Sequence, residues 1–334
     1  MEIRAEPPQR DTGKSGAESF REEHYQDYHQ EYRHQEDGKS REQVNRFVCT
    51  LVAIHRAIPG RWLVVAANRD EYLDRPAEGP ALRRSGERPV IAPLDIQAGG
   101  TWLGLNKEGV FAALTNLRDP KPDTTRLTRG RVVSDSLRCG TAAEAADQLM
   151  AIEAGVHNPF NAFVADRQRA FLVGYREKPV LHELQPGVHV VGNGDVAESG
   201  FSEGERSKVD RVRAKAEGIS HLPPDSVLDS LADLCRTHGV EESPLEDVCV
   251  HLGDAYGTRS SLLLELTEQF FASENFTEER HKGGSIQSAS PGLHHGASRL
   301  LYSDGPPCAA PFKDFSLLLE ELRQSPSYAP ADYA

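Results

Sequence analysis

The sequence predicts an α+β fold in which antiparallel sheets are covered by helices. Short apolar segments bounded by Gly, Pro and Asn recur through residues 49–116 and 161–191, which is typical of strands joined in hairpins. Segments with apolar residues at helical spacing interrupt them at residues 141–154 and 203–237. Groups of strands separated by groups of helices are the pattern of this fold class.

Most of the predicted strands lie in the first two thirds of the chain, where turn residues separate them. A Pro-Gly turn at residues 59–60 follows the first strand, and the loop at residues 107–109 contains the glycine that a hairpin of this length requires. Another Pro-Gly turn, at residues 186–187, separates the last two strands of this series. The predicted strands are residues 49–56, 62–67, 101–106, 110–116, 161–165, 170–175, 180–184 and 188–191.

The clearest predicted helix is alanine-rich, covers residues 141–154 and is closed by Gly155. In a later helix, Asp225 or Ser226 can cap the start and Gly239 can end it. The predicted helices are residues 141–154, 203–216, 225–237 and 315–322, and the late strands are 260–266 and 269–273, which form a hairpin, and 299–302.

Composition divides the chain into three parts. Residues 1–47 contain almost no aliphatic side chains and cannot bury enough apolar surface to offset the entropy of ordering, so they are predicted to be a disordered polar tail. Residues 48–323 are predicted to form one folded domain. Residues 324–334 are predicted to be a frayed end.

Net charge and hydropathy exclude several classes of function. The chain has 334 residues, with 38 Lys and Arg against 51 Asp and Glu, so its formal charge of −13 is a poor match for nucleic acid. No apolar run approaches the roughly 20 residues needed to span a membrane. Because the first 48 residues also fit neither a secretory signal nor a transit peptide, the predicted compartment is the cytoplasm.

The cysteines and histidines are predicted not to form a metal centre or a disulfide framework. The five cysteines are widely spaced and lack any CxxC pair, and the histidines show no ligand spacing. The cysteines are Cys49, Cys139, Cys235, Cys249 and Cys308. No cofactor is therefore predicted from these residues, the expected partner is a small-molecule substrate or ligand, and the oligomeric state stays open.

Cys49 is the first candidate for chemistry, because it opens the folded domain directly after the polar tail. A thiol is a poor nucleophile until it loses its proton, and the α-amine of the same residue has a pKa near 8 that suits a general base. That mechanism requires Cys49 to be the first residue, whereas here its amine is bonded to Val48. On residue type alone, a lone strand cysteine is more often a small core residue.

The polar run Asn68-Arg69-Asp70-Glu71 is the second candidate. It is predicted to follow an apolar strand directly, at the kind of position where scaffolds present functional groups. Arg69 would favour a thiolate or bind a carboxylate, and Asp70 or Glu71 could orient an amine or Arg69 itself. A turn with a surface salt bridge is the alternative.

Further polar residues could complete a site. Asn116 and Asn193 follow predicted strands and could donate to a developing oxyanion, although a Gly-Asn-Gly segment is also simply a good turn. Arg259 precedes a strand and could reach the same place or lie on the surface. A local basic patch could hold a carboxylate or phosphate of a ligand, but is expected to be a solvated helix face; it consists of Arg126, Arg129, Arg131 and Arg138.

These signals occur together and in the order seen in the NRDE family, the transport-and-Golgi-organisation protein 2 group, which the chain resembles from about Cys49 to Glu279. The motifs that carry the resemblance are Cys49, Ala67-Asn68-Arg69-Asp70-Glu71-Tyr72 with Arg75-Pro76, Gly99-Gly100-Thr101-Trp102-Leu103-Gly104, Ala112-Ala113-Leu114-Thr115-Asn116, Asn158-Pro159-Phe160-Asn161 and Gly257-Thr258-Arg259. The family is named for its Asn-Arg-Asp-Glu motif.

The resemblance implies a fold and a chemistry like those of N-terminal-nucleophile hydrolases. It implies a four-layer αββα sandwich of two antiparallel sheets and cleavage of a non-peptide amide of unknown identity. By resemblance to choloylglycine hydrolases and penicillin acylases, the catalytic roles would fall on Cys49, Arg69, Asp70, Asn116, Asn193 and Arg259. The motif or substrate-binding positions would be Asn68, Glu71, Trp102 and Asn161.

Two questions remain open at this point. Family members usually start with Met-Cys, whereas this chain has Val48-Cys49, so translation from a GTG codon at position 48 or removal of a pro-segment is expected to expose the cysteine. The alternative function is a non-catalytic binding or trafficking protein for haem, acyl-CoA or a lipid. In that case a Cys49 thiolate could be an axial haem ligand.

Overall fold

The computed structural model describes residues 49–117, 119, 121–194, 203–239, 244–271 and 296–326, with the side chains of 203–207 left out. The predicted polar tail, the proposed start at Val48 and most of the predicted frayed end lie outside the described residues. In the part of the chain that is described, no helix is long and apolar enough to cross a membrane.

Two antiparallel sheets, each of seven strands in the described residues, form the centre of the structure. Sheet A has the order β10-β1-β2-β12-β13-β14, and β11 pairs with β12. Its strands are β1 (Thr50–Ile58), β2 (Arg61–Tyr72), β10 (Gly187–Val191), β11 (His251–Leu252), β12 (Tyr256–Thr267), β13 (Arg299–Ser303) and β14 (Lys313–Asp314). Sheet B follows chain order and contains β3 (Ala77–Ser85), β4 (Arg88–Asp95), β5 (Leu103–Asn106), β6 (Phe111–Asn116), β7 (Phe160–Ala165), β8 (Ala170–Tyr175) and β9 (Pro179–Leu184).

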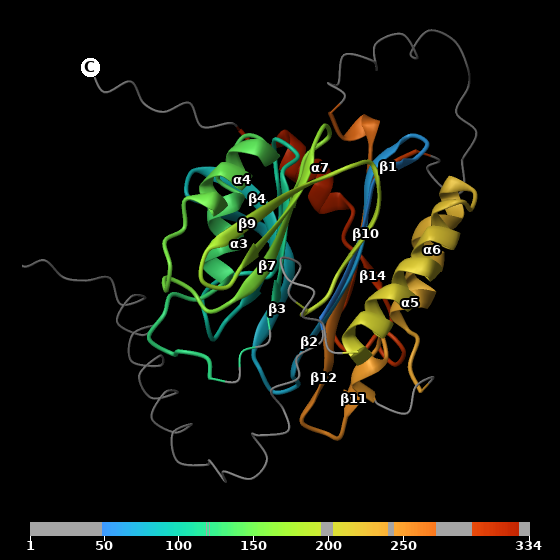
Figure 1. Ribbon diagram of the computed structural model, residues 1–334. Helices are drawn as coiled ribbons and strands as arrows, with labels where there is room; N and C mark the ends of the chain where they lie inside the picture. The colour runs from blue at the N-terminus through green and yellow to red at the C-terminus, as the bar shows by residue number, and fades with distance from the viewer. Residues whose placement is uncertain are drawn as a thin grey trace, which may run out of the picture. The chain divides into compact units, whose positions relative to one another are not determined.

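Helices cover the outer face of each sheet, so the predicted four-layer αββα sandwich is confirmed (Figure 1). One buried cluster joins sheet A to helices α5 and α6, and another joins sheet B to helices α3 and α4. Helix α7 packs at the rim against β3, β4 and β13. The helices are α3 (Gly130–Ser136), α4 (Ala142–Met150), α5 (Glu203–Ser220), α6 (Pro224–Cys235) and α7 (Leu317–Gln324).

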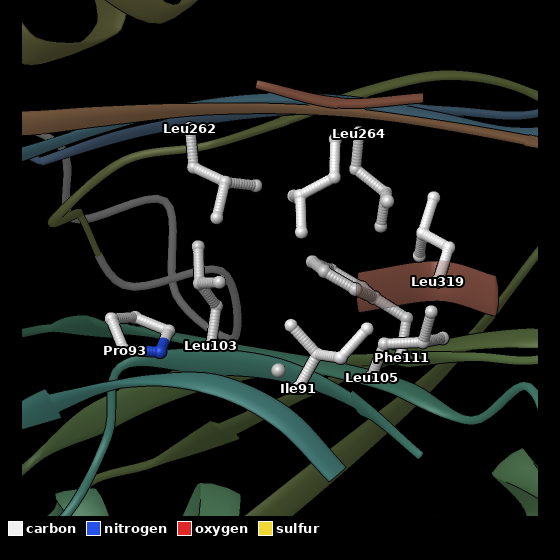
Figure 2. A pocket seen from close by; sticks show the side chains of 10 residues that line it. Ile91, Pro93, Leu103, Leu105, Phe111, Leu262, Leu264 and Leu319 are labelled. Atoms are coloured by element: carbon white, nitrogen blue, oxygen red, sulfur yellow. The ribbon is translucent and has the colours of Figure 1, made fainter. Parts of the chain in front are cut away.

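The two sheets pack face to face through an apolar layer. Alternate residues of β1, β2 and β12 point toward alternate residues of β5, β6 and β7, as the period of two in a strand requires. Figure 2 shows Leu262 and Leu264 of β12 above Ile91, Leu103 and Phe111 of sheet B. The cavity between them measures about 10 Å³, so the layer is closely packed.

The end of β12 differs from the prediction. The hairpin over residues 260–266 and 269–273 is wrong: Glu268–Phe271 forms a 3₁₀ turn, β12 pairs with β2 and β13, and residues 272–273 are outside the described part. The cause is that the adjacent Phe270 and Phe271 both pack on the core between the sheets. An alternating strand would direct one of them outward.

Other differences concern capping and turns. Helix α6 begins after Pro223 with Pro224 as its first residue and has no side-chain cap, whereas Asp225 or Ser226 was expected. Proline is suited to this position because the first helical N–H has no intrahelical partner. The 186–187 turn carries the chain from the edge of sheet B to the edge of sheet A. Strands β3 and β4 were not predicted, since prolines interrupt both.

Candidate functional site

Cys49 lies immediately before β1, half-buried, at the wall of two cavities. The larger cavity measures about 200 Å³ and the smaller about 10 Å³. Its Sγ is 3.6 Å from the backbone carbonyl of Asp70 on the neighbouring strand. Burial and the nearby Asp70 charge raise the pKa of the Cys49 thiol to about 12. With its amine in a peptide bond, Cys49 is therefore a neutral thiol at physiological pH.

The Asn-Arg-Asp-Glu run lies inside strand β2, not after it as predicted. It pairs with β12, with Asn68 opposite Ser261 and Asp70 opposite Thr258. Successive side chains of a strand point to opposite faces, so the motif is divided. Arg69 and Glu71 point toward sheet B and the larger cavity, whereas Asn68 and Asp70 point toward the helices that cover sheet A.

On the cavity face, Arg69 is held between an aromatic ring and two carboxylates. Its guanidinium lies 4.3 Å from the ring centroid of Trp102, a cation–π contact, and its Nη2 donates to Asp95 at 3.1 Å. Arg75 also donates to Asp95, at 2.8 Å, and Glu71 lies 3.7 Å from both arginines. The buried Nη1 of Arg69 has no hydrogen-bond partner among the described residues, and Arg69 is one of the residues that line the larger cavity.

The Gly99-Gly100 pair places Trp102 beside this cluster. Gly99 has a φ of 68°, in the left-handed region that glycine adopts without strain. A side chain on Gly100 would come within 2.8 Å of the backbone of Gly130 at the start of α3. This close approach brings α3 to the cavity, and with it the half-buried Arg129.

On the helix face, Asp70 forms the centre of a buried charged group. It is 2% exposed and its Oδ1 accepts a 2.6 Å hydrogen bond from Thr258, while its Oδ2 has no partner within the described part of the chain. Burial raises the pKa of the Asp70 carboxyl to about 7. Lys208 of α5 is 3% exposed, and burial lowers its pKa, whereas the charges of Asp70 and Cys49 act in the opposite direction. Lys208 also lines the smaller cavity with Cys49.

Asn68 has a structural position. Its Nδ2 donates to the carbonyls of Cys235 and Val248, at 3.0 and 2.9 Å, and its Oδ1 accepts from Ser261 at 2.7 Å. These bonds attach the end of α6 and the segment before β11 to the sheet. All three bonds are buried, so Asn68 anchors these segments, and the motif or substrate-binding role that the resemblance implies for it stays a prediction.

The three candidate asparagines have different positions. Asn116 lines the larger cavity, and its carbonyl accepts from Asn193 Nδ2 at 2.5 Å. Asn193 is buried and lines the smaller cavity beside Cys49. Asn161 donates to the carbonyls of Gly192 and Gly194, so it holds the turn that carries Asn193. Asn116 and Asn193 thus each line a cavity that Cys49 also lines, and Asn161 supports Asn193.

Arg259 and Arg129 lie in places that differ from the prediction: Arg259 is outside the cavities at Cys49, and Arg129 lines the larger one. Arg259 is paired with Asp304 at 2.6 Å and is absent from the walls of both cavities at Cys49 in the described residues. Arg129, expected on a solvated face, lines the larger cavity instead, and its Nη1 donates to the carbonyl of Pro159 at 3.2 Å. Burial lowers the pKa of Arg129. No carboxylate of the described residues lies within 4.0 Å of it.

Lys208 and Thr258 were missed as site residues. Lys208 interrupts the apolar stripe of α5, adjacent to Val209 and four residues before Val212, which are both buried. A lysine on the buried face of a helix is a detectable signal, because a buried ammonium requires polar or charged groups around it. Thr258 is part of the Gly-Thr-Arg motif, in which the charge of Arg259 is the stronger signal for a functional side chain.

The arrangement around Cys49 provides the parts of an acyl-transfer site. The Cys49 thiol shares the walls of its two cavities with the buried Asp70 and Lys208, with arginines and with the amide groups of two asparagines. The haem alternative fits this site poorly, because charged side chains of both signs line the larger cavity and the thiol keeps its proton. Elsewhere, against the expectation of no metal centre, His238, His251 and Cys308 gather at the surface.

The sequence is similar to those of one known protein family. A sequence profile of the family Transport and Golgi organisation 2 matches residues 48–282. The human protein "Transport and Golgi organization protein 2 homolog" is 29% identical over 199 residues, which are 56% of this chain and 69% of the human protein. The bovine protein of the same name is 31% identical over 141 residues, covering 39% of this chain and 50% of that protein.

Among solved structures, the chain is similar to penicillin V acylase from Agrobacterium tumefaciens, with 15% identity and a TM-score of 0.43 over 66% of this chain and 83% of that one. It is also similar to a mutant of conjugated bile acid hydrolase from Clostridium perfringens. There the identity is 12% and the TM-score 0.46, over 82% of this chain and 94% of that one. Both are distant likenesses.

Proposed function

The chain belongs to the Transport and Golgi organisation 2 family, and from this premise and the geometry around Cys49 we propose that it is a cysteine hydrolase of the N-terminal-nucleophile type that cleaves an amide. The observation that carries the proposal is the position of Cys49. Its thiol lies at the wall of a cavity of about 200 Å³, beside the buried Asp70 and Lys208. A purely structural cysteine needs neither neighbour.

The proposed reaction starts from a chain in which the Val48–Cys49 peptide bond has been cleaved or was never made. The α-amine of Cys49 takes the thiol proton, and Sγ attacks the amide carbonyl, so that a C–S bond forms. The tetrahedral oxyanion accepts hydrogen bonds from the side chains of Asn193 and Asn116. The C–N bond then breaks, the proton passes to the leaving amine, and water hydrolyses the thioester to a carboxylate and the free thiol.

Asp70 and Lys208 would set the charge around the amine. An α-ammonium at Cys49 would lie beside the Asp70 carboxyl, which would lower the pKa of that carboxyl and orient the amine. The same new positive charge would lower the pKa of the thiol from the value of about 12 that it has in the intact chain. The intact chain is then a latent form, and exposure of Cys49 is the activating step.

The larger cavity favours a substrate with an anionic group. Arg69 and Arg129 both line it, the Nη1 of Arg69 has no hydrogen-bond partner in the described residues, and no carboxylate there lies within 4.0 Å of Arg129. Guanidinium groups bind carboxylates and phosphates in a fixed bidentate geometry. We therefore expect the substrate to carry such a group on the side of the amide that faces α3.

The rival function, non-catalytic binding of haem, acyl-CoA or a lipid, is supported less well. A bound acyl chain needs a long apolar cavity, whereas the apolar cavity between the sheets measures about 10 Å³ (Figure 2). The cavity at Cys49 has charged walls, which suit a small polar ligand. The cytoplasmic compartment stays a prediction from the sequence.

The test compares the full chain with a chain that begins at Cys49, made by removal of an initiator Met. Both are incubated with a panel of small acyl amides that carry a carboxylate, and acylation is followed by intact mass and peptide mapping. We expect a thioester on Cys49 and product release only in the shortened chain, and a loss of at least about 1,000-fold in Cys49→Ala.

Cys139→Ser is the matched control, because Cys139 is a half-buried cysteine outside the site. It should leave acylation unchanged. Acylation that persists in Cys49→Ala would contradict the proposed nucleophile. A shortened chain that folds but reacts with none of the amides, while retaining a tightly bound small molecule from its host, would favour the binding protein.

A further inference from the structure

A second cluster of sulfur and nitrogen atoms lies away from both Cys49 cavities, where three segments of the chain meet. His238 follows α6, Cys249 and His251 lie at β11, and Cys308 lies in the turn after β13. The Sγ of Cys249 is 3.6 Å from the Sγ of Cys308 and 3.5 Å from His251 Nε2, and His251 Nε2 is 3.1 Å from the Sγ of Cys308. The ligand atoms of His238, His251 and Cys308 are all within 4.8 Å of one another.

These separations approach the edges of a tetrahedron around a zinc ion. With Zn–S bonds of about 2.3 Å and Zn–N bonds of about 2.05 Å, a tetrahedral site places two sulfurs about 3.8 Å apart and a sulfur and a nitrogen about 3.5 Å apart. Three of the four side chains already stand near these distances. The fourth, His238, has its ring centroid 5.1 Å from that of His251 and a ligand atom within 4.8 Å of those of His251 and Cys308.

Hydrogen bonds that do not involve these four side chains hold the segments together. Cys249 N donates to the carbonyl of Thr237 at 2.8 Å, which fixes the neighbouring His238 beside it. Ser303 at the end of β13 donates to carbonyls of the turn that contains Cys308. A site that is assembled by its framework binds a metal without a large ordering cost.

Burial and charge also suit a cation. Cys249 is buried, Cys308 is half-buried, and the two histidines are exposed, so the cluster has a closed inner end and an open outer end. Two thiolates neutralise a divalent ion, and sulfur with imidazole nitrogen selects zinc over magnesium or calcium. We propose that Cys249, Cys308, His251 and His238 form a zinc-binding site.

A zinc ion at this site would stabilise the hydrogen bonds that hold Thr258 against Asp70. Val250, between two of the ligands, donates its N–H to the Oγ1 of Thr258 at 2.8 Å, and that hydroxyl donates to Asp70 at 2.6 Å. The ion would connect β11 to the turn after β13, and so would hold Val250 in place to bond Thr258. Because an ion that binds only the folded state stabilises it by mass action, zinc is expected to raise the melting temperature.

The test uses the full chain, stripped of metal with a chelator and kept reduced. Zinc is titrated in competition with a chromophoric chelator, and the stoichiometry is measured by native mass spectrometry. Cobalt replaces zinc in a parallel sample, because tetrahedral thiolate coordination gives intense visible bands and a sulfur-to-metal charge-transfer band. We expect one ion per chain and both cobalt signatures.

Cys308→Ser and His251→Gln should each weaken zinc binding by more than about 100-fold, beyond the 10–100-fold that loss of an outer-shell partner costs. They should also abolish the zinc-dependent rise in melting temperature. Cys139→Ser is the control and should bind zinc as the wild type does. His251→Gln changes an exposed side chain, so it keeps the test valid where Cys308→Ser fails to fold.

Three results would overturn the site. One is a reduced wild-type chain that takes up less than one zinc ion at saturating concentration. Another is zinc affinity that is unchanged in both His251→Gln and Cys308→Ser. The third is that protein from the host contains a Cys249–Cys308 disulfide, and that this protein binds neither zinc nor cobalt after the disulfide is reduced.

Discussion

The surroundings of Cys49 and of Cys249 show how neighbours decide what a buried thiol can do. Burial raises the pKa of both thiols. Beside Cys49 stand a carboxyl, a lysine and an open cavity, whereas beside Cys249 stand a second thiol and an imidazole within 3.6 Å. The first set can move a proton and hold a substrate, and the second can share a cation. Burial alone therefore does not distinguish a nucleophile from a ligand.

The largest expected effect is on thiol reactivity. Exposure of the α-amine should accelerate alkylation of Cys49 by about 100-fold relative to the intact chain, because the gain in thiolate outweighs the loss in nucleophilicity. Cys249 should react equally slowly in both chains, and zinc should protect it further. Iodoacetamide labelling followed by peptide mass spectrometry measures both rates. Equal rates for Cys49 in the two chains would remove the role of the amine.

The next effect concerns the helix face of the Asn-Arg-Asp-Glu motif. Asn68→Ala leaves the buried carbonyls of Cys235 and Val248 without their donor, so it should lower the free energy of unfolding by about 2 kcal/mol. Urea unfolding measures it. Asn158→Ala is the matched control, because the bond from Asn158 to Asp123 is exposed and its loss should cost little. Equal costs would show that Asn68 is no anchor.

The features of the fold and the site that could be predicted are those marked by residues close together in the sequence. Cys49, Arg69 and the αββα layers followed from residue order and from the family resemblance. The division of the motif between two faces did not, because buried polar residues made the end of β2 look like a turn. The zinc cluster could not be predicted from spacing, since Cys308 is 57 residues from His251 and the sheet brings them together.

A smaller effect is expected in the pH dependence of stability. The pKa of Asp70 rises from 3.8 to about 7 on folding, so the folded state holds this proton more tightly than the unfolded chain. Its contribution is complete below about pH 4 and is lost as the pH rises through 7. Between pH 4.5 and 7.5 this titration should lower the free energy of unfolding of the wild type by more than about 1.4 kcal/mol. Asp70→Asn should not show this decrease.

Lys208→Met sharpens that measurement. The lysine charge lowers the pKa of Asp70, so its removal should shift the loss of stability to higher pH. Urea unfolding of the three proteins at several pH values gives the slopes. If wild type and Asp70→Asn show the same slope, the Asp70 carboxyl does not titrate in this window and the expected pKa shift is absent.

The smallest effect separates the two arginines that exchanged their expected positions. The measured quantity is the ratio of the alkylation rate with negatively charged iodoacetate to that with neutral iodoacetamide. In a chain that begins at Cys49, the arginines of the larger cavity should make this ratio higher for Cys49 than for a free thiol. Arg129→Gln should reduce that ratio by about fivefold, or about 1 kcal/mol, because one partly exposed charge is lost. Arg259→Gln should leave the ratio unchanged, since Arg259 is paired with Asp304 outside the cavity walls. Equal effects of both substitutions would mean that the net charge of the protein, and not this cavity, attracts the anion.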